Sequence, residues 1–247
     1  MARSDGVATA DREALTACPP IDGVLFDYHS TVVDGGDPHT WIAHGWAFAG
    51  RNGTAREVWS QAAYDRVADV LLHIWEHGRQ IDPRHERDLS PVRHREVFDG
   101  IMTLLPEVDA ALTDGLYATM VDQWVEYDDA VPVVRALKTA GIRVGVLSNV
   151  GFDVREAMRR QGLLELVDSI TLSFEAGVVK PGAGIFQRAV SDLATPIERT
   201  LMVGDTWTED GAAAGIGLRT LLLPRTRGPV HGLGLVLRML DLPADAC

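Results

Sequence analysis

Five residues of the chain carry side chains suited to chemistry on an anion, and each lies at or shortly after a short apolar run: Asp27, Ser148, Lys180, Asp205 and Asp210. A well-placed carboxylate can act as a nucleophile, and carboxylate oxygens are the ligands that Mg²⁺ prefers. A lysine ammonium or a divalent cation offsets the repulsion between clustered carboxylates and an anionic substrate. These residue types therefore indicate chemistry on an anionic small molecule, provided that the fold brings them together.

The apolar runs before these residues are typical of buried strands, and helical patterns separate them. Strands are predicted at 21–26, 142–147, 169–173 and 201–203, and helices at 131–140, 153–161 and 184–193. Because strand and helix alternate, we expect an α/β fold with a parallel sheet and helices on both faces. Ligands of such sheets bind at the carboxyl ends of the strands, where Asp27, Ser148 and Asp205 should converge.

Residues 35–129 interrupt this alternation and contain only helix signals. We therefore expect a tail at 1–20, a core built from 21–34 and 130–247, and an all-α insert at 35–129 that covers the carboxyl ends of the strands. The second helix of the insert is expected to run unbroken to Gly78. The four expected helices begin at Asp37-Pro38, Thr54, Ser90-Pro91 and Pro106-Glu107.

Four short motifs follow one another in the order found in the haloacid dehalogenase-like (HAD) hydrolase superfamily. They are Asp27-Tyr28-His29-Ser30-Thr31, Ser148-Asn149, Lys180-Pro181, and Gly204-Asp205 followed by Asp210. The chain from about Ile21 to Leu223 thus resembles a HAD hydrolase, with its helical insert at the place of the family's helical (C1-type) cap. The resemblance implies a Rossmann-like core, dependence on Mg²⁺ and a covalent aspartyl intermediate.

The resemblance also implies a role for each motif residue. Asp27 is the expected nucleophile, and Lys180 is expected to neutralise Asp27 and the transferring oxygens. Mg²⁺ is expected to bind Asp27, Asp205, Asp210 and the main-chain carbonyl of His29, with Glu209 as an alternative to Asp210. The candidate substrate-binding residues are Thr31, Ser148 and Asn149.

Position 29 departs from the pattern of most phosphatases in the superfamily, which have a second Asp there as general acid and base. A residue two positions along a strand points to the same side, so the His29 imidazole would occupy the acid/base position. Three interpretations stay open. His29 is the acid/base, it orients a substrate whose leaving group needs no proton, or the protein has lost phosphatase activity and retains a binding role.

The leading hypothesis is a Mg²⁺-dependent hydrolase that acts on a small phosphorylated metabolite through an aspartyl phosphate on Asp27. The alternatives are a 2-haloacid dehalogenase-type C–halogen hydrolase and a catalytically impaired HAD-like binding protein. Halide release requires no metal, whereas Asp205 and Asp210 beside a nucleophilic carboxylate call for a cation, which favours the phosphatase. Substrate identity and oligomeric state stay open.

Overall charge limits the partners. Lys and Arg number 23 against 35 Asp and Glu, and the net charge of −12 disfavours nucleic acids and anionic membranes. Two cysteines and the lack of an apolar run of about 20 residues predict a cytoplasmic protein without a membrane span. One local stretch is basic and would attract a second anionic group of a substrate if it faced the sheet: Arg84, His85, Arg87, Arg93, His94 and Arg95.

Overall fold

The computed structural model describes residues 19–243, so the predicted tail lies outside the described residues except for Pro19 and Pro20. Five strands form a parallel sheet in the order β5-β4-β1-β6-β7. Phe26 at the end of β1 lies level with Val146 of β4 and Val203 of β6, and β4 and β6 end two residues and one residue beyond that level, so the carboxyl ends of the three central strands lie at one edge of the sheet. The strands are β1 (Gly23–Phe26), β4 (Arg143–Ser148), β5 (Ser169–Leu172), β6 (Thr200–Gly204) and β7 (Arg219–Leu222).

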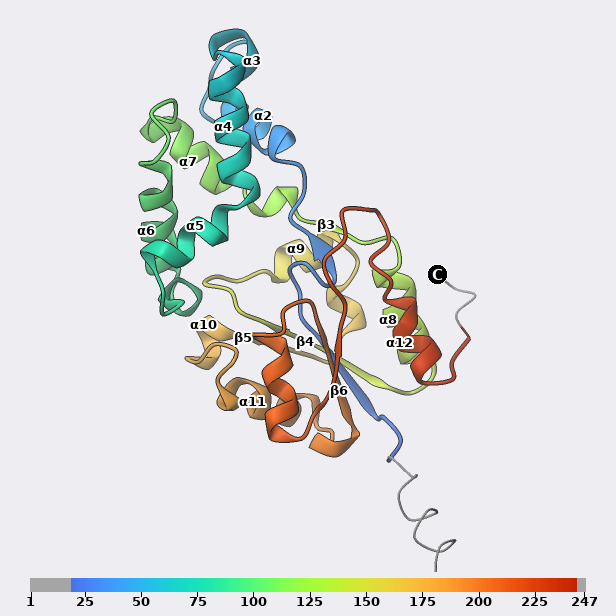
Figure 1. Cartoon of the computed structure of the whole chain (residues 1–247). Helices are drawn as coiled ribbons and strands as arrows, with labels where there is room; N and C mark the ends of the chain where they lie inside the picture. The colour runs from blue at the N-terminus through green and yellow to red at the C-terminus, as the bar shows by residue number, and fades with distance from the viewer. Residues whose placement is uncertain (1–18, 244–247) are drawn as a thin grey trace, which may run out of the picture.

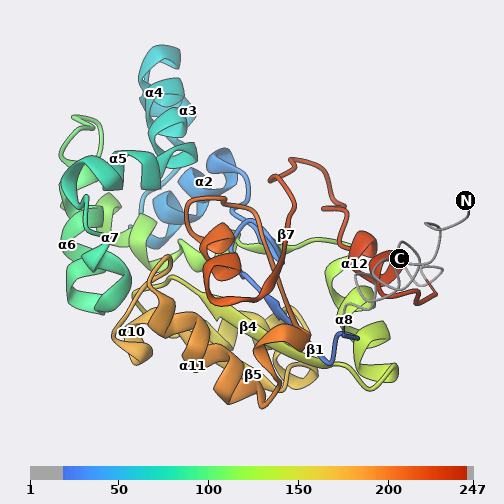
Figure 2. The ribbon, with the colours of Figure 1, turned by 60° about the horizontal axis from the view of Figure 1, so that its bottom comes forward.

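Helices cover both faces of this sheet, as Figures 1 and 2 show, with α8 (Ala130–Thr139) and α12 (Gly234–Met239) on one face and α11 (Ala183–Leu193) on the other. Successive side chains of a strand point to opposite faces. Val24 and Phe26 accordingly pack with α8 and α12, while Leu25 packs with α11. An all-apolar strand needs cover on both faces, and the expected α/β Rossmann-like fold is confirmed.

All four predicted strands are present, but two further strand features have no counterpart in the prediction. Strand β7 escaped it because Arg219 and Thr220 interrupt its apolar character and all its residues are half-buried at the sheet edge. A ribbon of β2 (Val33–Asp34) and β3 (Val125–Glu126) joins the chain entering the helical region to the chain leaving it. Two residues per strand are too few to show a period.

Residues 35–129, called the helical insert below, form helices around an apolar cluster of their own that includes Trp41, Phe98 and Leu116. The helices that begin at Pro38 and Pro91 each follow a capping side chain, which comes from Asp37 and Ser90. Asp37 accepts the N–H of Thr40 at 3.0 Å. The helices are α2 (Pro38–Phe48), α3 (Ala55–Val58), α4 (Gln61–Leu72), α5 (Ile74–Ile81), η1 (Glu86–Leu89), α6 (Pro91–Met102), α7 (Ala110–Ala118) and η2 (Val121–Gln123).

Two helix predictions for the insert were wrong. The expected long second helix is divided into α3, α4 and α5, because the Ser60 hydroxyl accepts the N–H of Ala63 at 3.3 Å and starts α4 anew, and because the backbone leaves helical geometry at His73. The last helix begins at Ala110 instead of Pro106, since the Asp109 carboxylate caps it.

The remaining short elements lie in the sheet-forming part of the chain. They are α9 (Arg155–Arg160), η3 (Leu164–Leu166), α10 (Ser173–Ala176), η4 (Ile197–Arg199) and η5 (Asp210–Ile216).

Across residues 19–243, no helix combines the length and the apolar character needed to cross a membrane.

Candidate active site

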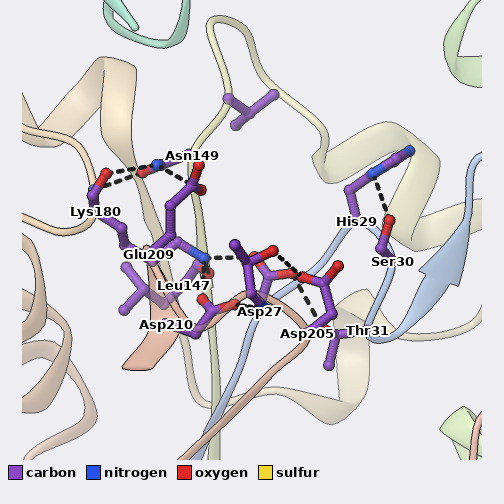
Figure 3. Close-up of polar contacts among 12 residues, drawn as sticks. Asp27, His29, Ser30, Thr31, Leu147, Asn149, Lys180, Asp205, Glu209 and Asp210 are labelled. Carbon is purple, nitrogen blue, oxygen red and sulfur yellow. Dashed lines mark hydrogen bonds and ion pairs between the residues drawn. The ribbon is translucent and has the colours of Figure 1, made fainter. Parts of the chain in front are cut away.

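Three carboxylates meet at the carboxyl end of the central strands (Figure 3). Asp27 follows β1, Asp205 follows β6, and Asp210 begins η5. One carboxylate oxygen from each lies within 4.8 Å of the other two. The convergence expected from the strand ends is therefore present, and Asp210 provides the third carboxylate of this cluster, which does not include Glu209.

One buried ammonium links this cluster. Lys180 Nζ donates to Asp27 Oδ1 and to Asp210 Oδ1, both at 2.6 Å. The backbone of Lys180 is fixed in turn by Asn149, whose Oδ1 accepts the Lys180 N–H at 2.7 Å and whose Nδ2 donates to the Lys180 carbonyl at 3.0 Å. Lys180 is thus positioned against the two carboxylates by the loop that follows β4.

The carboxylates are held by the turns around them. Thr31 is fully buried, and its hydroxyl donates to Asp27 Oδ2 at 3.1 Å. Asp210 accepts the N–H of Thr206 at 3.0 Å. A Cβ on Gly204 would lie 2.2 Å from the Asp210 carboxyl carbon, so only glycine leaves room for this carboxylate at the end of β6.

Electrostatics in the cluster favour an additional cation. Burial raises the pKa of Asp27 to about 8, with Lys180 opposing the shift and Asp210 and Asp205 adding to it. The pKa of Asp205 is also raised, by burial and by Asp210. Burial alone would lower the pKa of Lys180, but the carboxylates of Asp210 and Asp27 outweigh it and raise that pKa. Three clustered oxygen donors with one ammonium fit a hard divalent cation such as Mg²⁺.

His29 lies to one side of this cluster and points away from it in Figure 3. Its Nδ1 is 3.1 Å from the Ser30 hydroxyl, and its ring meets the Trp124 ring edge-on at 5.0 Å between centroids. Burial lowers the pKa of His29 to about 4, with Arg225 adding to this shift and Asp34 opposing it. The imidazole is therefore neutral near pH 7, with one ring nitrogen able to accept a proton.

A cavity of about 340 Å³ lies between the carboxyl end of the sheet and the helical insert. Asp27, Asp205 and Asp210 line one end of it, together with Lys180 and the buried Ser148. Asn149 and His29 also reach this cavity, whereas Thr31 lies behind Asp27. The structure thus brings seven of the eight predicted site residues to one cavity. The eighth, Thr31, lies outside the lining and contacts the candidate nucleophile Asp27.

Several cavity residues were not predicted as site residues. Arg79 of α5 lies 3.8 Å from Glu209, and Arg225 donates through Nε to Asp34 at 3.0 Å. Neither belongs to a motif or follows a strand end, so no local signal marks them. Of the basic stretch between Arg84 and Arg95, only Arg87 and His94 line the cavity.

Comparisons with known proteins agree with this architecture. A family model described as haloacid dehalogenase-like hydrolase matches residues 21–217. The chain is 30% identical over 129 residues to haloacid dehalogenase-like hydrolase domain-containing protein 3 of Danio rerio, covering 50% of this chain and 53% of that protein. It is 29% identical over 172 residues to ribulose-1,5-bisphosphate 5-phosphatase of Halopiger xanaduensis, covering 66% and 71%. It is 32% identical over 105 residues to (S)-2-haloacid dehalogenase 1 of Pseudomonas sp., covering 42% and 46%.

The chain spans about half the length of the Danio and Pseudomonas relatives that it matches. Among solved structures, it resembles the magnesium-bound HAD-hydrolase YfnB from Bacillus subtilis with a TM-score of 0.64 and 18% identity, covering 90% of this chain and 100% of that one. Likeness at this level of identity concerns the fold. Since the family model covers most of the chain, this protein belongs to the haloacid dehalogenase-like hydrolases.

Proposed function

We propose that this protein is a Mg²⁺-dependent phosphatase that hydrolyses small phosphorylated metabolites. The observation that carries the proposal is the cluster of Asp27, Asp205 and Asp210 around one buried ammonium, with Lys180 Nζ 2.6 Å from two of the carboxylates. With all three carboxyls ionised, three carboxylates and one lysine carry two net negative charges, which a divalent cation would balance. Phosphoryl transfer uses this combination of a nucleophile, a metal and a lysine.

The proposed metal ligands are Asp27, Asp205, Asp210 and the main-chain carbonyl of His29. When bound, Mg²⁺ supplies positive charge that offsets the repulsion between the Asp27 carboxylate and an anionic phosphoryl group. The similarity to a magnesium-bound member of the family supports this choice of metal.

In the first proposed step, a carboxylate oxygen of Asp27 attacks phosphorus while the phosphorus–oxygen bond of the ester breaks. The leaving alcohol takes its proton from His29, whose imidazole is neutral without a ligand and gains this proton as the anionic phosphoryl group binds beside it. In the second step, water attacks the phosphorus of the aspartyl phosphate and gives a proton to His29. Inorganic phosphate leaves, and the Asp27 carboxylate is restored. Ser148 is the proposed donor to the phosphoryl oxygens, while Thr31 and Asn149 act through their hydrogen bonds to Asp27 and Lys180.

The size and cover of the cavity support a small substrate. A volume of about 340 Å³ beneath a helical insert accommodates a metabolite but not a folded phosphoprotein. We propose that residues 35–129 act as a cap that excludes water during the reaction. A cytoplasmic location, with no nucleic acid as partner, completes the proposal on the basis of charge and cysteine content.

A second candidate function is hydrolysis of a carbon–halogen bond. Two observations favour it. The residue two positions after Asp27 is His29 instead of a second Asp, and the chain is 32% identical over 105 residues to a 2-haloacid dehalogenase. Asp27 would then attack carbon and expel halide, which needs no proton from His29. The three clustered carboxylates count against this candidate, because the reaction provides no cation for them.

Hydrolysis of p-nitrophenyl phosphate tests the proposal. Turnover is expected in the presence of Mg²⁺. It should be lost when EDTA is added, return with excess Mg²⁺, and be absent in the Asp27→Asn variant. Asp192→Asn is the matched control, because Asp192 pairs with Arg188 on the exposed side of α11. Metal-independent chloride release from 2-chloropropionate would establish the second candidate instead.

Two further measurements separate the interpretations of His29 and of the site. His29→Asn is expected to lose turnover and His29→Asp to retain it, whereas equal and undiminished turnover in both would remove His29 from the chemistry. Failure to trap beryllofluoride as a mimic of the aspartyl phosphate, despite measurable binding of a ligand, would identify a catalytically impaired binding protein.

A further inference from the structure

The helical insert contributes one buried cation with unused hydrogen-bonding capacity. Arg87 in η1 is 6% exposed and lines the cavity. Its Nη2 lies 3.3 Å from a carboxylate oxygen of Asp88, and its guanidinium carbon lies 5.2 Å from the centre of the Trp75 ring. Its Nη1 is buried and has no hydrogen-bond partner among the described residues. A buried N–H group without an acceptor is unfavourable, so an acceptor from the cavity's contents would complete this site.

The backbone of Arg87 is held against the sheet-forming part of the chain. The Arg87 N–H donates to Asp82 Oδ2 at 2.8 Å, which fixes the turn of η1. The Ser173 hydroxyl at the end of β5 donates to the Asp88 carbonyl. A Cβ on Gly151 would lie 2.2 Å from the Arg87 carbonyl oxygen, so η1 rests directly on the loop after β4. The backbone of Arg87 is therefore fixed relative to both walls of the cavity.

The other cations of the cavity are either fully paired or open to solvent. Lys180 is buried and shared by two carboxylates, whereas the side chains of Arg79 and Arg225 are partly exposed, beside Glu209 and Asp34. In Arg87, Asp88 contacts only Nη2. Nη1 is buried without an acceptor among the described residues, so a shift of the Arg87 side chain toward the cavity would bring its N–H groups to a ligand oxygen. Guanidinium groups bind carboxylates and phosphates through charge-assisted hydrogen bonds.

We propose that Arg87 binds a second anionic group of the substrate, a carboxylate or a second phosphate, while the phosphoryl group to be removed lies at Asp27. This inference rests on the proposed phosphatase function and narrows its substrates to phosphate monoesters that carry another anion. It also assigns different surroundings to two arginines of the basic stretch between Arg84 and Arg95. Arg93 lies beside Glu96 and Asp82, away from the cavity lining, while Arg87 faces the cavity.

Matched pairs of substrates test the inference. 3-Phosphoglycerate and glycerol 3-phosphate differ only in a carboxylate, and fructose 1,6-bisphosphate and fructose 6-phosphate differ only in a second phosphate. The measured quantity is the ratio of kcat/KM within each pair, which cancels any loss common to both members. The wild type is expected to favour the member that carries the second anionic group, in at least one pair, by about tenfold or more in kcat/KM. This is the contribution of about one charge-assisted hydrogen bond. The pair that shows the preference identifies the anion.

Variants assign the preference to Arg87. Arg87→Met is expected to lower the ratio about tenfold. Arg87→Lys, which keeps the charge and the aliphatic stem, is expected to lower it less and serves if the Met variant does not fold. Arg95→Met is the matched control, because Arg95 pairs with Asp99 and Asp114 outside the cavity lining, and its ratio is expected to stay at the wild-type value. A wild type without anion preference, or the same ratio in the Arg87 variants, overturns the inference.

Failure of the proposed function gives a different result. If neither p-nitrophenyl phosphate nor any of the four esters is hydrolysed with Mg²⁺, the phosphatase proposal is wrong. Calorimetric titration with both pairs then decides the inference. Tighter binding of 3-phosphoglycerate or fructose 1,6-bisphosphate by the wild type than by Arg87→Met supports it, and equal binding of both compounds by the two proteins overturns it.

Discussion

Acidification is expected to destabilise this protein through His94 of α6. The imidazole is buried between the rings of Trp75 and Phe152, with centroid distances of 4.9 and 4.8 Å. Its Nδ1 lies 3.1 Å from the Tyr117 hydroxyl. Protonation would place a positive charge among aromatic rings with little water, which the folded state resists.

The size of the effect follows from the pKa. Burial lowers the pKa of His94 from 6.5 to about 4, with Asp88 opposing the shift and Arg87 adding to it. Because the unfolded chain binds this proton more tightly, the stabilisation is complete above about pH 6.5 and is lost as the pH falls toward 4. These two pKa values give a loss of about 2 kcal/mol between pH 7 and pH 5, approaching ~3 kcal/mol below pH 4.

Urea unfolding of the wild type and His94→Phe at pH 7 and pH 5 measures this loss. The free energy of unfolding of the wild type is expected to fall by about 2 kcal/mol more than that of the variant. His29 and His231, whose pKa values are also lowered, are present in both proteins, so the difference isolates His94. His94→Gln, which retains a donor toward Tyr117, is expected to behave like the Phe variant. Equal pH dependence in the wild type and both variants would refute the reasoning.

Three further substitutions probe the site and its cover. Gly204→Ala is expected to displace Asp210 and abolish the rise in melting temperature that Mg²⁺ gives the wild type, whereas Gly215→Ala, with no atom near its added Cβ, should keep that rise. Lys180→Met is expected to lower the free energy of unfolding by about 3–5 kcal/mol at neutral pH, and by less at acid pH, where the carboxyls protonate. Urea unfolding that shows no such loss would contradict the view that Lys180 offsets the repulsion between the carboxylates. Gly151→Ala would place its Cβ 2.2 Å from a carbonyl oxygen of η1, and its melting temperature should fall by an amount corresponding to about 1–3 kcal/mol.

The convergence of side chains at one end of the cavity could be predicted from the sequence because strand geometry determines it. Asp27, Ser148 and Asp205 each come at or directly after the end of an apolar run. In a parallel sheet whose strands end at one edge, such residues meet whatever else packs around them. Local capping signals were equally informative, as at Asp37 and Ser90, since a side-chain cap acts within one turn of its own helix.

The end of the cavity formed by the helical insert could not be predicted in the same way, because contacts between distant segments determine it. Leu71 and Trp75 keep helical spacing across the break at His73, so periodicity does not reveal where α4 ends. Arg87 and Arg95 carry the same charge in the same basic stretch. Only the packing of η1 on Gly151 places the first at the cavity, while the second meets carboxylates elsewhere on the insert.

The charge of the cavity connects the two ends. Six carboxylates line it against four cations, Arg79, Arg87, Lys180 and Arg225, so with all carboxyls ionised it carries two negative charges. Such a cavity repels a phosphate monoester until a divalent cation balances it. In the proposed reaction the metal and the anion must therefore strengthen each other's binding, by the same factor in both directions. Under the two proposals, this coupling would explain how a chain of net charge −12 selects a substrate with two anionic groups, since the metal would neutralise one end of the cavity and leave Arg87 to recognise the second anion.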